Sequence, residues 1–353
     1  MNIAKIQEED FDRILDGFES YKRFKNSEIL ITGYGGFIGF YLVKFLIAKK
    51  NTLKWKKLIL IDNFKTKLTN KLYLEKTNDV LIINNDLLKI NFKSKKFSNV
   101  NFIFHMASIA SPHFYRKYPL ETIEANVTGL KLLLESFKNR KVNLLFFSSS
   151  EVYGNPPKDK IPTKESYLGN VSTIGPRSCY DESKRFCETL CYYFDKKFNI
   201  SIKIVRPFNN YGPGLNMKDK RLPADLSNYI LNNKNILIHS DGSPSRAFCY
   251  ISDAITGFLQ AITYKKFDIF NIGNDKNEIS VLKLAQIYKN IGNKHFGFDK
   301  NIIIKKSSDK EYLINNPYRR RPDITKANKL LNFIPHISVF EGVERYLFYL
   351  SQK

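Results

Sequence analysis

Short apolar runs that alternate with helical patterns constrain most strongly what this chain can fold into. The runs cover residues 28–32, 57–62, 80–84, 101–105, 143–148 and 202–207. Helical patterns lie between most of them, at residues 37–49, 119–138 and 180–198. Uninterrupted apolar strands separated by helices are typical of a parallel sheet that is covered on both faces. The sequence therefore predicts an α/β fold with a doubly wound parallel sheet.

The length of 353 residues allows one large domain or two modest ones. Residues 1–27 precede the first apolar run, and the pattern after Pro207 is looser and richer in turns. The apolar residues that recur at helical spacing in the first segment are Phe11, Ile14, Leu15 and Phe18. We expect a helical extension over 1–27 that packs on the main domain or on a second subunit. A sheet domain over 28–207 and a smaller α/β substrate domain over 208–353 would follow, with some C-terminal elements returning to the sheet domain.

The charge balance is strongly basic, with 57 Lys and Arg against 34 Asp and Glu and a net charge of +23. Such a charge attracts phosphate, and nucleic-acid binding is one interpretation of it. The basic residues are spread over many segments, however, and no RNA-recognition signature or zinc-finger spacing accompanies them. We therefore expect no nucleic-acid partner. A positive surface would instead help to collect an anionic small substrate.

Two further features bear on the cellular compartment. No apolar run approaches the roughly 20 residues of a membrane-spanning helix, and charges throughout residues 1–27 argue against a signal peptide. Cys179, Cys187, Cys191 and Cys249 lack the paired spacing of a zinc site. They are typical of buried thiols in a reducing compartment. We expect a cytoplasmic protein without a membrane or metal partner.

A glycine-rich turn follows the first apolar run. Gly33, Gly36 and Gly39 would allow the tight turn, the approach of a pyrophosphate and close packing of the next helix. A tight strand-to-helix turn alone could also explain the three glycines. Asp62, however, ends the second run where a carboxylate accepts hydrogen bonds from the adenosine ribose, which favours NAD over NADP. We predict NAD as the cofactor, with Asp86 beside its adenine.

Tyr180 and Lys184 are four residues apart and share one face of a predicted helix. A nearby ammonium and the nicotinamide charge would stabilise the tyrosine phenolate, which could then take a proton while hydride leaves the same carbon. Ser149, at the end of the fifth run, would hydrogen-bond to the reacting oxygen. The same spacing also arises by chance on exposed helices.

Together these motifs resemble the extended short-chain dehydrogenase/reductase family, whose members modify nucleotide sugars with NAD on a Rossmann fold. The resemblance covers residues 28–349, and it is carried by residues 105–112, 148–154, 175–185, 246–253 and 319–324. Within the family these segments are most similar to those of UDP-glucuronate decarboxylases. Related 4-epimerases, 4,6-dehydratases and 4-dehydrogenases share several of them, so these activities stay open, as does a non-catalytic scaffold role.

The resemblance also implies site residues. It makes Tyr180, Lys184, Ser149, Glu151, Ser150 and Arg320 the catalytic set. NAD would contact Tyr180, Lys184 and the residues Gly33, Gly36, Phe37, Ile38, Gly39, Asp62, Asn63, Asp86, Leu87, Ala107, Ser108, Thr122 and Pro207. The nucleotide sugar would contact Pro112, Tyr115, Asn209, Arg221, Arg246 and Arg320. For Thr122, helix capping and packing are an equal alternative.

The Ser150–Glu151 pair separates the possible reactions. Related dehydratases carry Asp-Glu there, and the Asp supplies an acid that a serine hydroxyl cannot replace. The decarboxylase pattern has Ser-Glu and an arginine near the C-terminus, which Arg320 matches; a guanidinium suits a carboxylate well. A solvated basic turn over 319–321 is the alternative interpretation.

The family usually forms dimers through the tyrosine-bearing helix and the helix at 119–138, so we expect a homodimer. Two features depart from the family pattern. The extension at 1–27 is not part of it, and the charge of residues 115–118 differs near the expected sugar position.

Overall fold

The computed structural model describes residues 2–66, 78–305, 307, 309, 311, 314 and 316–352. A parallel sheet in the order β3-β2-β1-β4-β5-β6-β11 forms its centre. Its strands are β1 (Glu28–Thr32), β2 (Lys57–Asp62), β3 (Val80–Asn84), β4 (Val100–His105), β5 (Val142–Phe147), β6 (Ile200–Pro207) and β11 (Ile269–Ile272). The order reverses between β1 and β4, as in a doubly wound Rossmann sheet. The predicted fold class is confirmed.

The predicted strands agree closely with the observed ones. β1, β2 and β3 have the predicted bounds, and β4, β5 and β6 differ from them by at most two residues at either end. β11 was not predicted, and it pairs with β6 only after the chain has passed through the C-terminal part.

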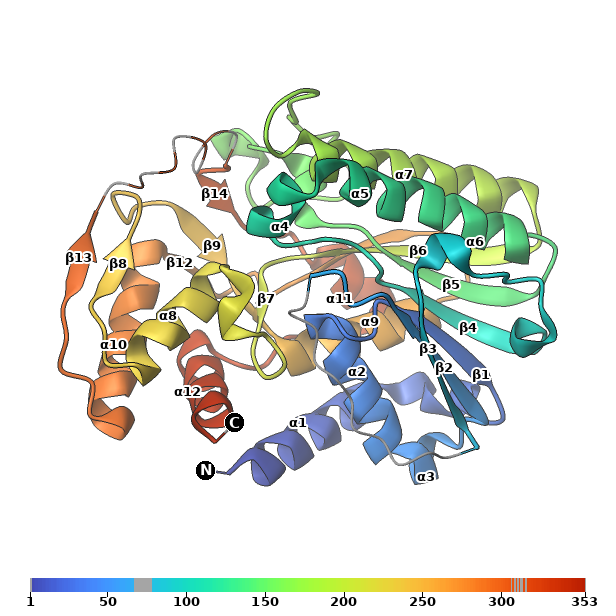
Figure 1. Cartoon of the computed structure of the whole chain (residues 1–353), viewed down its shortest axis with the longest axis horizontal. Coiled ribbons are helices and arrows are strands. Elements are labelled where there is room, and N and C mark those ends of the chain that lie inside the picture. Colours follow the sequence, from blue (N-terminus) through green and yellow to red (C-terminus); the bar gives the residue numbers. More distant parts are fainter. Residues whose placement is uncertain are drawn as a thin grey trace.

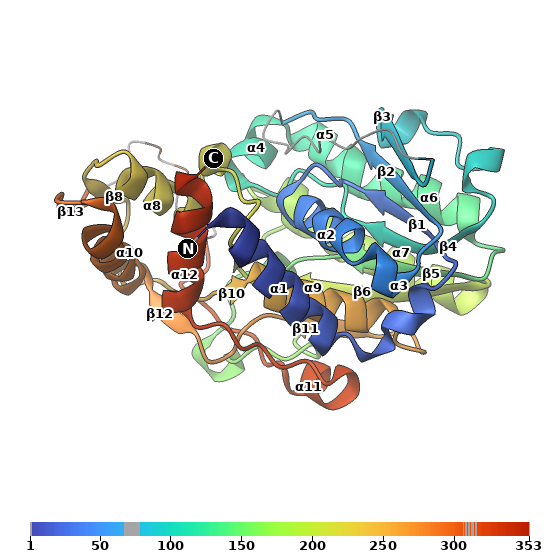
Figure 2. The same ribbon diagram turned by 90° about the horizontal axis from the view of Figure 1, so that it is seen from below.

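Helices cover both faces of the sheet (Figures 1 and 2). α2 (Phe37–Ala48) and α9 (Ile251–Ile262) lie on one face, and α5 (Pro119–Ile123), α6 (Gly129–Phe137) and α7 (Ser178–Lys197) lie on the other. The helix predicted over 119–138 is observed as α5 and α6, which a π-helical turn at Glu124–Thr128 joins directly. In that turn the buried Asn126 donates to Ser183 Oγ of α7 at 2.8 Å, which ties the turn to α7.

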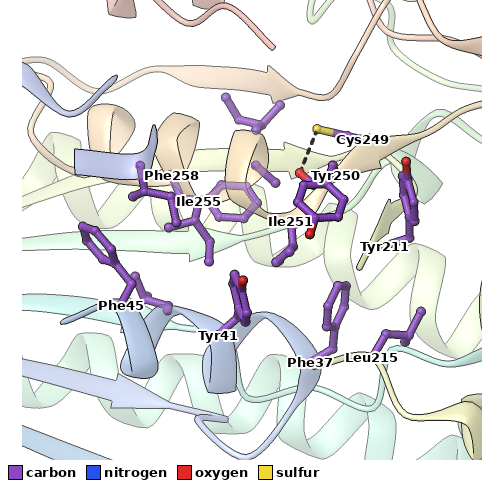
Figure 3. Packing of buried hydrophobic residues seen from close by; sticks show 14 of the residues in the cluster. Phe37, Tyr41, Phe45, Tyr211, Leu215, Cys249, Tyr250, Ile251, Ile255 and Phe258 are labelled. Atoms are coloured by element: carbon purple, nitrogen blue, oxygen red, sulfur yellow. Dashed lines mark hydrogen bonds between the residues drawn. The ribbon is translucent and has the colours of Figure 1, made fainter. Parts of the chain in front are cut away.

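The larger apolar core lies between the sheet and the helices of the first face. Figure 3 shows Phe37, Tyr41 and Phe45 of α2 facing the side chains of α9. All three aromatic rings are at most 9% exposed. This packing fixes α2, and with it the glycine-rich turn at its start, against the sheet.

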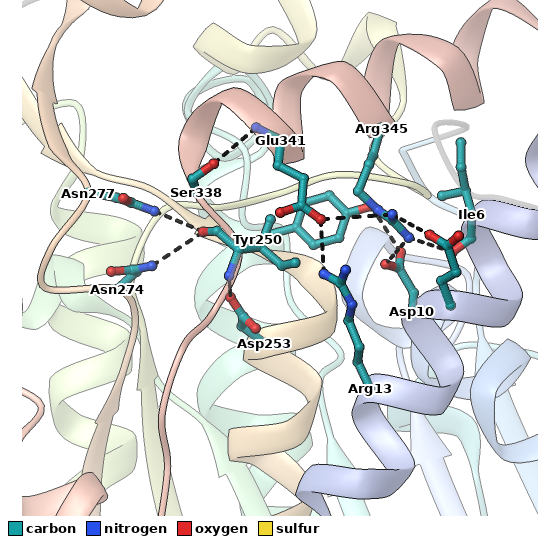
Figure 4. A network of polar contacts seen from close by, with 12 residues as sticks. Ile6, Asp10, Arg13, Tyr250, Asp253, Asn274, Asn277, Ser338, Glu341 and Arg345 are labelled. Atoms are coloured by element: carbon teal, nitrogen blue, oxygen red, sulfur yellow. Dashed lines mark hydrogen bonds and ion pairs between the residues drawn. The ribbon is translucent and has the colours of Figure 1, made fainter. Parts of the chain in front are cut away.

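The N-terminal extension contains the predicted helix. α1 (Ile3–Gly17) packs on α9 and on α12 (Val339–Ser351), and a 3₁₀ segment follows at Glu19–Phe24. Asp10 of α1 is fully buried and accepts from Tyr41 Oη at 2.6 Å, Tyr250 Oη at 2.9 Å and Arg345 Nη2 at 2.8 Å. Figure 4 shows Asp10 of α1 beside Arg345 of α12 and Tyr250. The extension thus packs on the chain's own main body, which is one of the two surfaces expected for it.

The C-terminal part carries smaller sheets and helices beside the central sheet (Figure 1). Its elements are β7 (Asn210–Tyr211), α8 (Leu222–Leu231), β8 (Ile236–Ile238), β9 (Ser245–Ala247), β10 (Cys249–Tyr250), β12 (Glu278–Ser280), α10 (Val281–Phe296), β13 (Ile302–Ile304), β14 (Arg319–Arg320) and α11 (Thr325–Leu331). Two short helices precede it, α3 (Lys50–Leu53) and α4 (Pro112–Lys117). Within the described part of the chain, none of the helices has both the length and the apolar character that a membrane span requires.

Candidate active site

A cavity of about 650 Å³ opens at the carboxyl ends of the central strands. Its walls include Gly33 after β1, Met106 after β4, Ser148 after β5 and Pro207 at the end of β6. From there the cavity extends over α4 and α8 to β9 and β14. It therefore lies where doubly wound sheets bind their ligands, beside the reversal of the strand order.

The glycine-rich turn forms one end of this cavity. Gly33 has a φ of 78°, and a Cβ there would lie 2.7 Å from the backbone nitrogen of Ala107. A Cβ on Gly39 would lie 2.5 Å from the Gly33 carbonyl oxygen. Only glycine fits at both positions, so the start of α2 lies close against the turn. Phe37 and Ile38 line the cavity beside Gly33, Gly36 and Gly39, and the N-terminal N–H groups of a helix suit a phosphate.

A carboxylate follows β2 beside this turn. Asp62 accepts from the N–H of Gly35 at 3.0 Å and from the N–H of Phe64 at 2.7 Å, while Asn63 Nδ2 donates to Asp86 Oδ2 at 2.9 Å. Each carboxylate oxygen of Asp62 has a further lone pair for a ligand hydroxyl. Burial raises the pKa of Asp62, and the three backbone N–H groups near it act against that rise. The turn, the helix start and this carboxylate fit the diphosphate and ribose of a dinucleotide.

The other predicted cofactor residues divide into two groups. Ser108 and Pro207 line the cavity. Leu87 is buried in the core against Gly129, and the Ala107 N–H lies 3.4 Å from Thr32 Oγ1. Thr122 donates to the Tyr118 carbonyl at 2.7 Å, which is the packing contact that had been its alternative.

Tyr180, Lys184 and Ser149 meet on the cavity wall. Burial raises the pKa of Tyr180 to about 12, although a hydrogen bond with Ser149 lowers it. The ammonium of Lys184 lies 5.8 Å from the centre of the Tyr180 ring and donates to the Phe147 carbonyl at 2.8 Å. Burial lowers the pKa of Lys184 to about 8. The arrangement can ionise a phenol once a positive ligand is close to it.

Glu151 forms ion pairs with two arginines on the same cavity wall. Arg320 donates to both of its carboxylate oxygens, with 2.7 Å between Nη2 and Oε2, and Arg177 donates to Oε2 as well. Burial by itself would raise the pKa of Glu151, but the two guanidinium charges hold it well below its usual range. Arg320 is only 5% exposed, so the solvated-turn interpretation of 319–321 does not describe it. Ser150 lies beside this pair and also lines the cavity.

Arg177 and Asp181 are site residues that the sequence did not predict. Arg177 Nε lies 3.5 Å from Asp181 Oδ2, one turn apart at the start of α7. Burial, and then the charge of Glu151, raise the pKa of Asp181 to about 7. Their position in the segment 175–185, around Tyr180, was the one signal that could have indicated a role.

The predicted substrate residues lie along the rest of the cavity. Pro112, Tyr115, Asn209, Arg221 and Arg246 all line it. Arg221 makes two contacts to Asp219, one of them 2.9 Å from Nη2 to Oδ2. Arg246 donates to the carbonyl oxygens of Pro317 and Tyr318, and Asn209 Nδ2 donates to the Ala247 carbonyl at 2.9 Å. Besides Arg177 and Arg320, the cavity is thus lined by the cationic side chains of Arg221 and Arg246.

Comparison with known proteins identifies the family. The model of the NAD dependent epimerase/dehydratase family matches residues 29–273. The chain belongs to this family. Its curated relatives include UDP-glucuronic acid decarboxylase 1 of Arabidopsis thaliana, 34% identical over 91% of this chain and 69% of that protein. UDP-glucuronic acid decarboxylase 1 of Danio rerio is 32% identical over 92% of this chain and 73% of that protein.

Solved structures of the same family have the same fold. UDP-glucuronic acid 4-epimerase from Bacillus cereus, in complex with UDP-glucuronic acid and NAD, has a TM-score of 0.73 and 26% identity over 92% of this chain and 99% of that one. UDP-glucose 4-epimerase from Thermotoga maritima, with UDP-glucose, has a TM-score of 0.79 and 25% identity over 92% of this chain and 99% of that one. The predicted family resemblance is confirmed, and the chain is an NAD-dependent enzyme of the epimerase/dehydratase family.

Proposed function

We propose that this enzyme converts UDP-glucuronic acid into UDP-xylose by removing the sugar carboxylate as CO₂. The observation that carries the proposal is the pair Arg177 and Arg320, which meets Glu151 on the wall that also holds Tyr180. Guanidinium groups match a carboxylate in charge and shape. The names of the curated relatives support the same reaction.

When bound, NAD supplies the oxidation at C4 of the sugar and the later return of the same hydride. Tyr180 takes the proton of the C4 hydroxyl during the oxidation and returns a proton during the reduction. Ser149 holds the C4 oxygen, and Lys184 stabilises the phenolate of Tyr180. Asp62 holds the ribose, because it lies beside the glycine-rich turn and its carboxylate has spare lone pairs.

Loss of CO₂ follows from the oxidised sugar itself. With a carbonyl at C4, the carboxylate belongs to a β-keto acid. The bond between C5 and C6 breaks, its electrons move toward the C4 oxygen, and C5 then takes up a proton. Glu151, Ser150 and Arg320 position the sugar and its carboxylate for this step. Ser150, as a hydroxyl, cannot be the acid that elimination of water at C6 needs.

The remaining residues of the two predicted sets complete the proposal. The cofactor contacts are Gly33, Gly36, Phe37, Ile38, Gly39, Asn63, Asp86, Leu87, Ala107, Ser108, Thr122 and Pro207. The nucleotide-sugar contacts are Pro112, Tyr115, Asn209, Arg221 and Arg246. Arg221 and Arg246 would face the diphosphate, which the net charge of +23 would also attract.

A 4-epimerase acting on the same substrate is the second candidate, because the Bacillus cereus relative is such an enzyme. The test is to incubate the purified chain with UDP-glucuronic acid and NAD and to read the products by mass spectrometry. A product lighter by one CO₂ is expected. An unchanged mass with an inverted C4 would establish the epimerase, loss of water a dehydratase, and accumulating NADH a 4-dehydrogenase.

The organisation of the chain is also part of the proposal. Exposed apolar residues on α5 and α7 support a homodimer through these helices: Leu120, Ile123, Phe186, Tyr192 and Tyr193. The four free cysteines support a reducing, cytoplasmic compartment, where UDP-xylose would serve polysaccharide biosynthesis. The units would be the extension 1–27, the NAD-binding domain 28–207 and the mainly sugar-binding domain 208–353. Sedimentation velocity of the purified chain would establish the dimer.

A further inference from the structure

A buried group of four charges forms the wall where the proposed sugar carboxylate binds. Glu151 pairs with Arg320 and Arg177, and Arg177 in turn pairs with Asp181. The side chains of the two arginines and Asp181 are at most 10% exposed, and that of Glu151 is 19% exposed. We call these four residues the charge cluster.

The members of the charge cluster differ in their access to a ligand. Glu151, Arg177 and Arg320 line the cavity, whereas Asp181 lies behind Arg177. Asp181 Oδ1 is buried without a hydrogen-bond partner among the described residues, and its Oδ2 has the single 3.5 Å contact with Arg177. Glu151 is much better satisfied, because two guanidinium groups contact its two oxygens.

A substrate carboxylate changes the charge balance of this wall. Within the charge cluster, two arginines and two ionised carboxylates are neutral together, so a third carboxylate adds a negative charge that the cluster itself does not compensate. A buried charge without a partner is costly, and the usual outcome is that one of the acids binds a proton. The least satisfied acid in the cluster is Asp181.

We infer that Asp181 takes up a proton when a uronic-acid nucleotide binds, which frees Arg177 from Asp181 to hold the substrate carboxylate beside Glu151 and Arg320. This inference rests on the proposed function. The proton comes from solvent and forms an O–H bond on Asp181, and no bond of the substrate changes in this step. Asp181 does not line the cavity, so it is a positioning residue that acts through Arg177. When the carboxylate leaves as CO₂, the balance returns and Asp181 releases its proton.

The groups around Asp181 make it the one that titrates near neutral pH. Facing it are Glu151 before α7, Arg177 and Cys179 at the start of α7, Tyr180 beside it, Tyr115 of α4 and Arg320 of β14. Burial raises the pKa of both tyrosines and of Cys179 further above neutrality, and the two arginines hold the pKa of Glu151 low. Burial raises the pKa of Asp181 to about 7 even before a ligand adds its charge.

The consequence is a difference between two ligands. Above about pH 7 the affinity for UDP-glucuronic acid should fall with rising pH, by up to about tenfold per pH unit, because binding requires a proton. UDP-glucose has the same nucleotide and no carboxylate, so its affinity should lack this fall. Titration of groups at the nucleotide end affects both ligands and cancels in the comparison.

The test uses the full chain loaded with NAD and carrying Tyr180→Phe, which prevents turnover during the measurement. Isothermal titration calorimetry between about pH 6 and about pH 9, in buffers of different ionisation enthalpy, gives the affinity and the proton uptake for each ligand. We expect greater proton uptake with UDP-glucuronic acid than with UDP-glucose. Adding Asp181→Asn should abolish the difference in proton uptake between the two ligands. It should also raise the affinity for UDP-glucuronic acid at about pH 9 by about tenfold or more.

Glu182→Gln is the matched control, because it removes one negative charge from the same helix, where Glu182 instead faces Arg185 at 3.5 Å. It should leave the proton uptake unchanged. Equal pH dependence for the two ligands in the protein without the Asp181 change overturns the inference, even if the Asp181→Asn variant does not fold. Unchanged excess uptake in a folded Asp181→Asn variant also overturns it. Loss of the proposed function is distinguished separately, because the enzyme with Tyr180 intact would then release no CO₂.

Discussion

The ring of Tyr115 lies flat against the ring of Tyr180, with 5.1 Å between the ring centroids and 12° between the ring planes. The stack joins α4, which follows β4, to α7, which carries the proposed base. It contributes to the burial that raises the pKa of Tyr180 to about 12. In this enzyme the phenol is therefore held away from water, and it needs a positive charge nearby before it can act as a base.

Replacing Tyr180 by Phe should remove the proposed acid–base group without disturbing the fold, since the ring and its stack on Tyr115 remain. We expect turnover of UDP-glucuronic acid to fall by about 10²–10⁴-fold, the usual effect of losing such a group. NAD should stay bound, which chromatography of the cofactor released from the denatured variant would measure. Turnover within a few-fold of the unmodified enzyme would contradict the role of Tyr180.

The hydrogen bond with Ser149 lowers the pKa of Tyr180, so Ser149→Ala should raise that pKa. Because the phenolate is the active form, kcat should fall as pH falls below the pKa of Tyr180 in the complex. The variant should shift this acidic limb to higher pH, which the pH profile of kcat measures. Ser148→Ala is the control, since Ser148 donates to Glu188 at 2.6 Å instead, and its limb should not move.

Tyr115 lines the cavity, and its hydroxyl is buried without a hydrogen-bond partner among the described residues. Tyr115→Phe should therefore change the free energy of unfolding by less than about 0.5 kcal/mol. If the hydroxyl binds the sugar, KM for UDP-glucuronic acid should rise by about tenfold, the value of one hydrogen bond. Urea denaturation and steady-state kinetics measure the two effects, and an unchanged KM would exclude the contact.

The fold could be predicted well because its signals are local. Apolar runs mark β1 to β6, and the glycine-rich turn marks the start of α2 within eight residues of sequence, 32–39. β11 has only four residues, and its pairing with β6 depends on a return of the chain from the C-terminal part. A single short run carries no information about such a long-range pairing.

The site residues also divide into those with a local sequence signal and those that only the fold brings together. Tyr180 and Lys184 could be predicted because their spacing on one helix face is itself the signal. The charge cluster could not, because Glu151 is 26 residues from Arg177 and 169 residues from Arg320. The family resemblance predicted that Arg320 lies near the sugar carboxylate, but only the fold brings Glu151 to it. Asp181 gains its raised pKa from burial and from Glu151, and neither is visible in the sequence.

Asp62 ties the end of β2 to the glycine-rich turn and has spare acceptor capacity for ribose hydroxyls. Asp62→Asn should weaken NAD binding by about tenfold or more, because a hydrogen bond to a charged group is worth about 1.5–3 kcal/mol. The loss of the negative charge should also reduce the preference for NAD over NADP. Fluorescence titration with both cofactors measures these effects, and an unchanged ratio of the two affinities would contradict the assignment.

The network between α1 and α12 makes a prediction about stability. Arg345 is 2% exposed and donates to Asp10, to Glu9 at 2.7 Å and to the Ile6 carbonyl at 3.0 Å. Arg345→Met should lower the free energy of unfolding by about 3–5 kcal/mol, because it leaves the buried Asp10 without its cation. Urea denaturation of the full chain measures this loss.

The same variant should show a characteristic pH dependence. Burial already raises the pKa of Asp10, and removal of Arg345 raises it further. When a carboxyl group has a higher pKa in the folded than in the unfolded protein, the free energy of unfolding falls as the pH rises between those two pKa values. Arg345→Met should therefore lower the free energy of unfolding less at about pH 5 than at about pH 7. The control is Arg13→Met, which breaks the exposed pair with Glu341 and should cost less than about 1 kcal/mol at either pH. Equal losses for Arg345→Met and Arg13→Met would mean that the extension is not held by the buried pair.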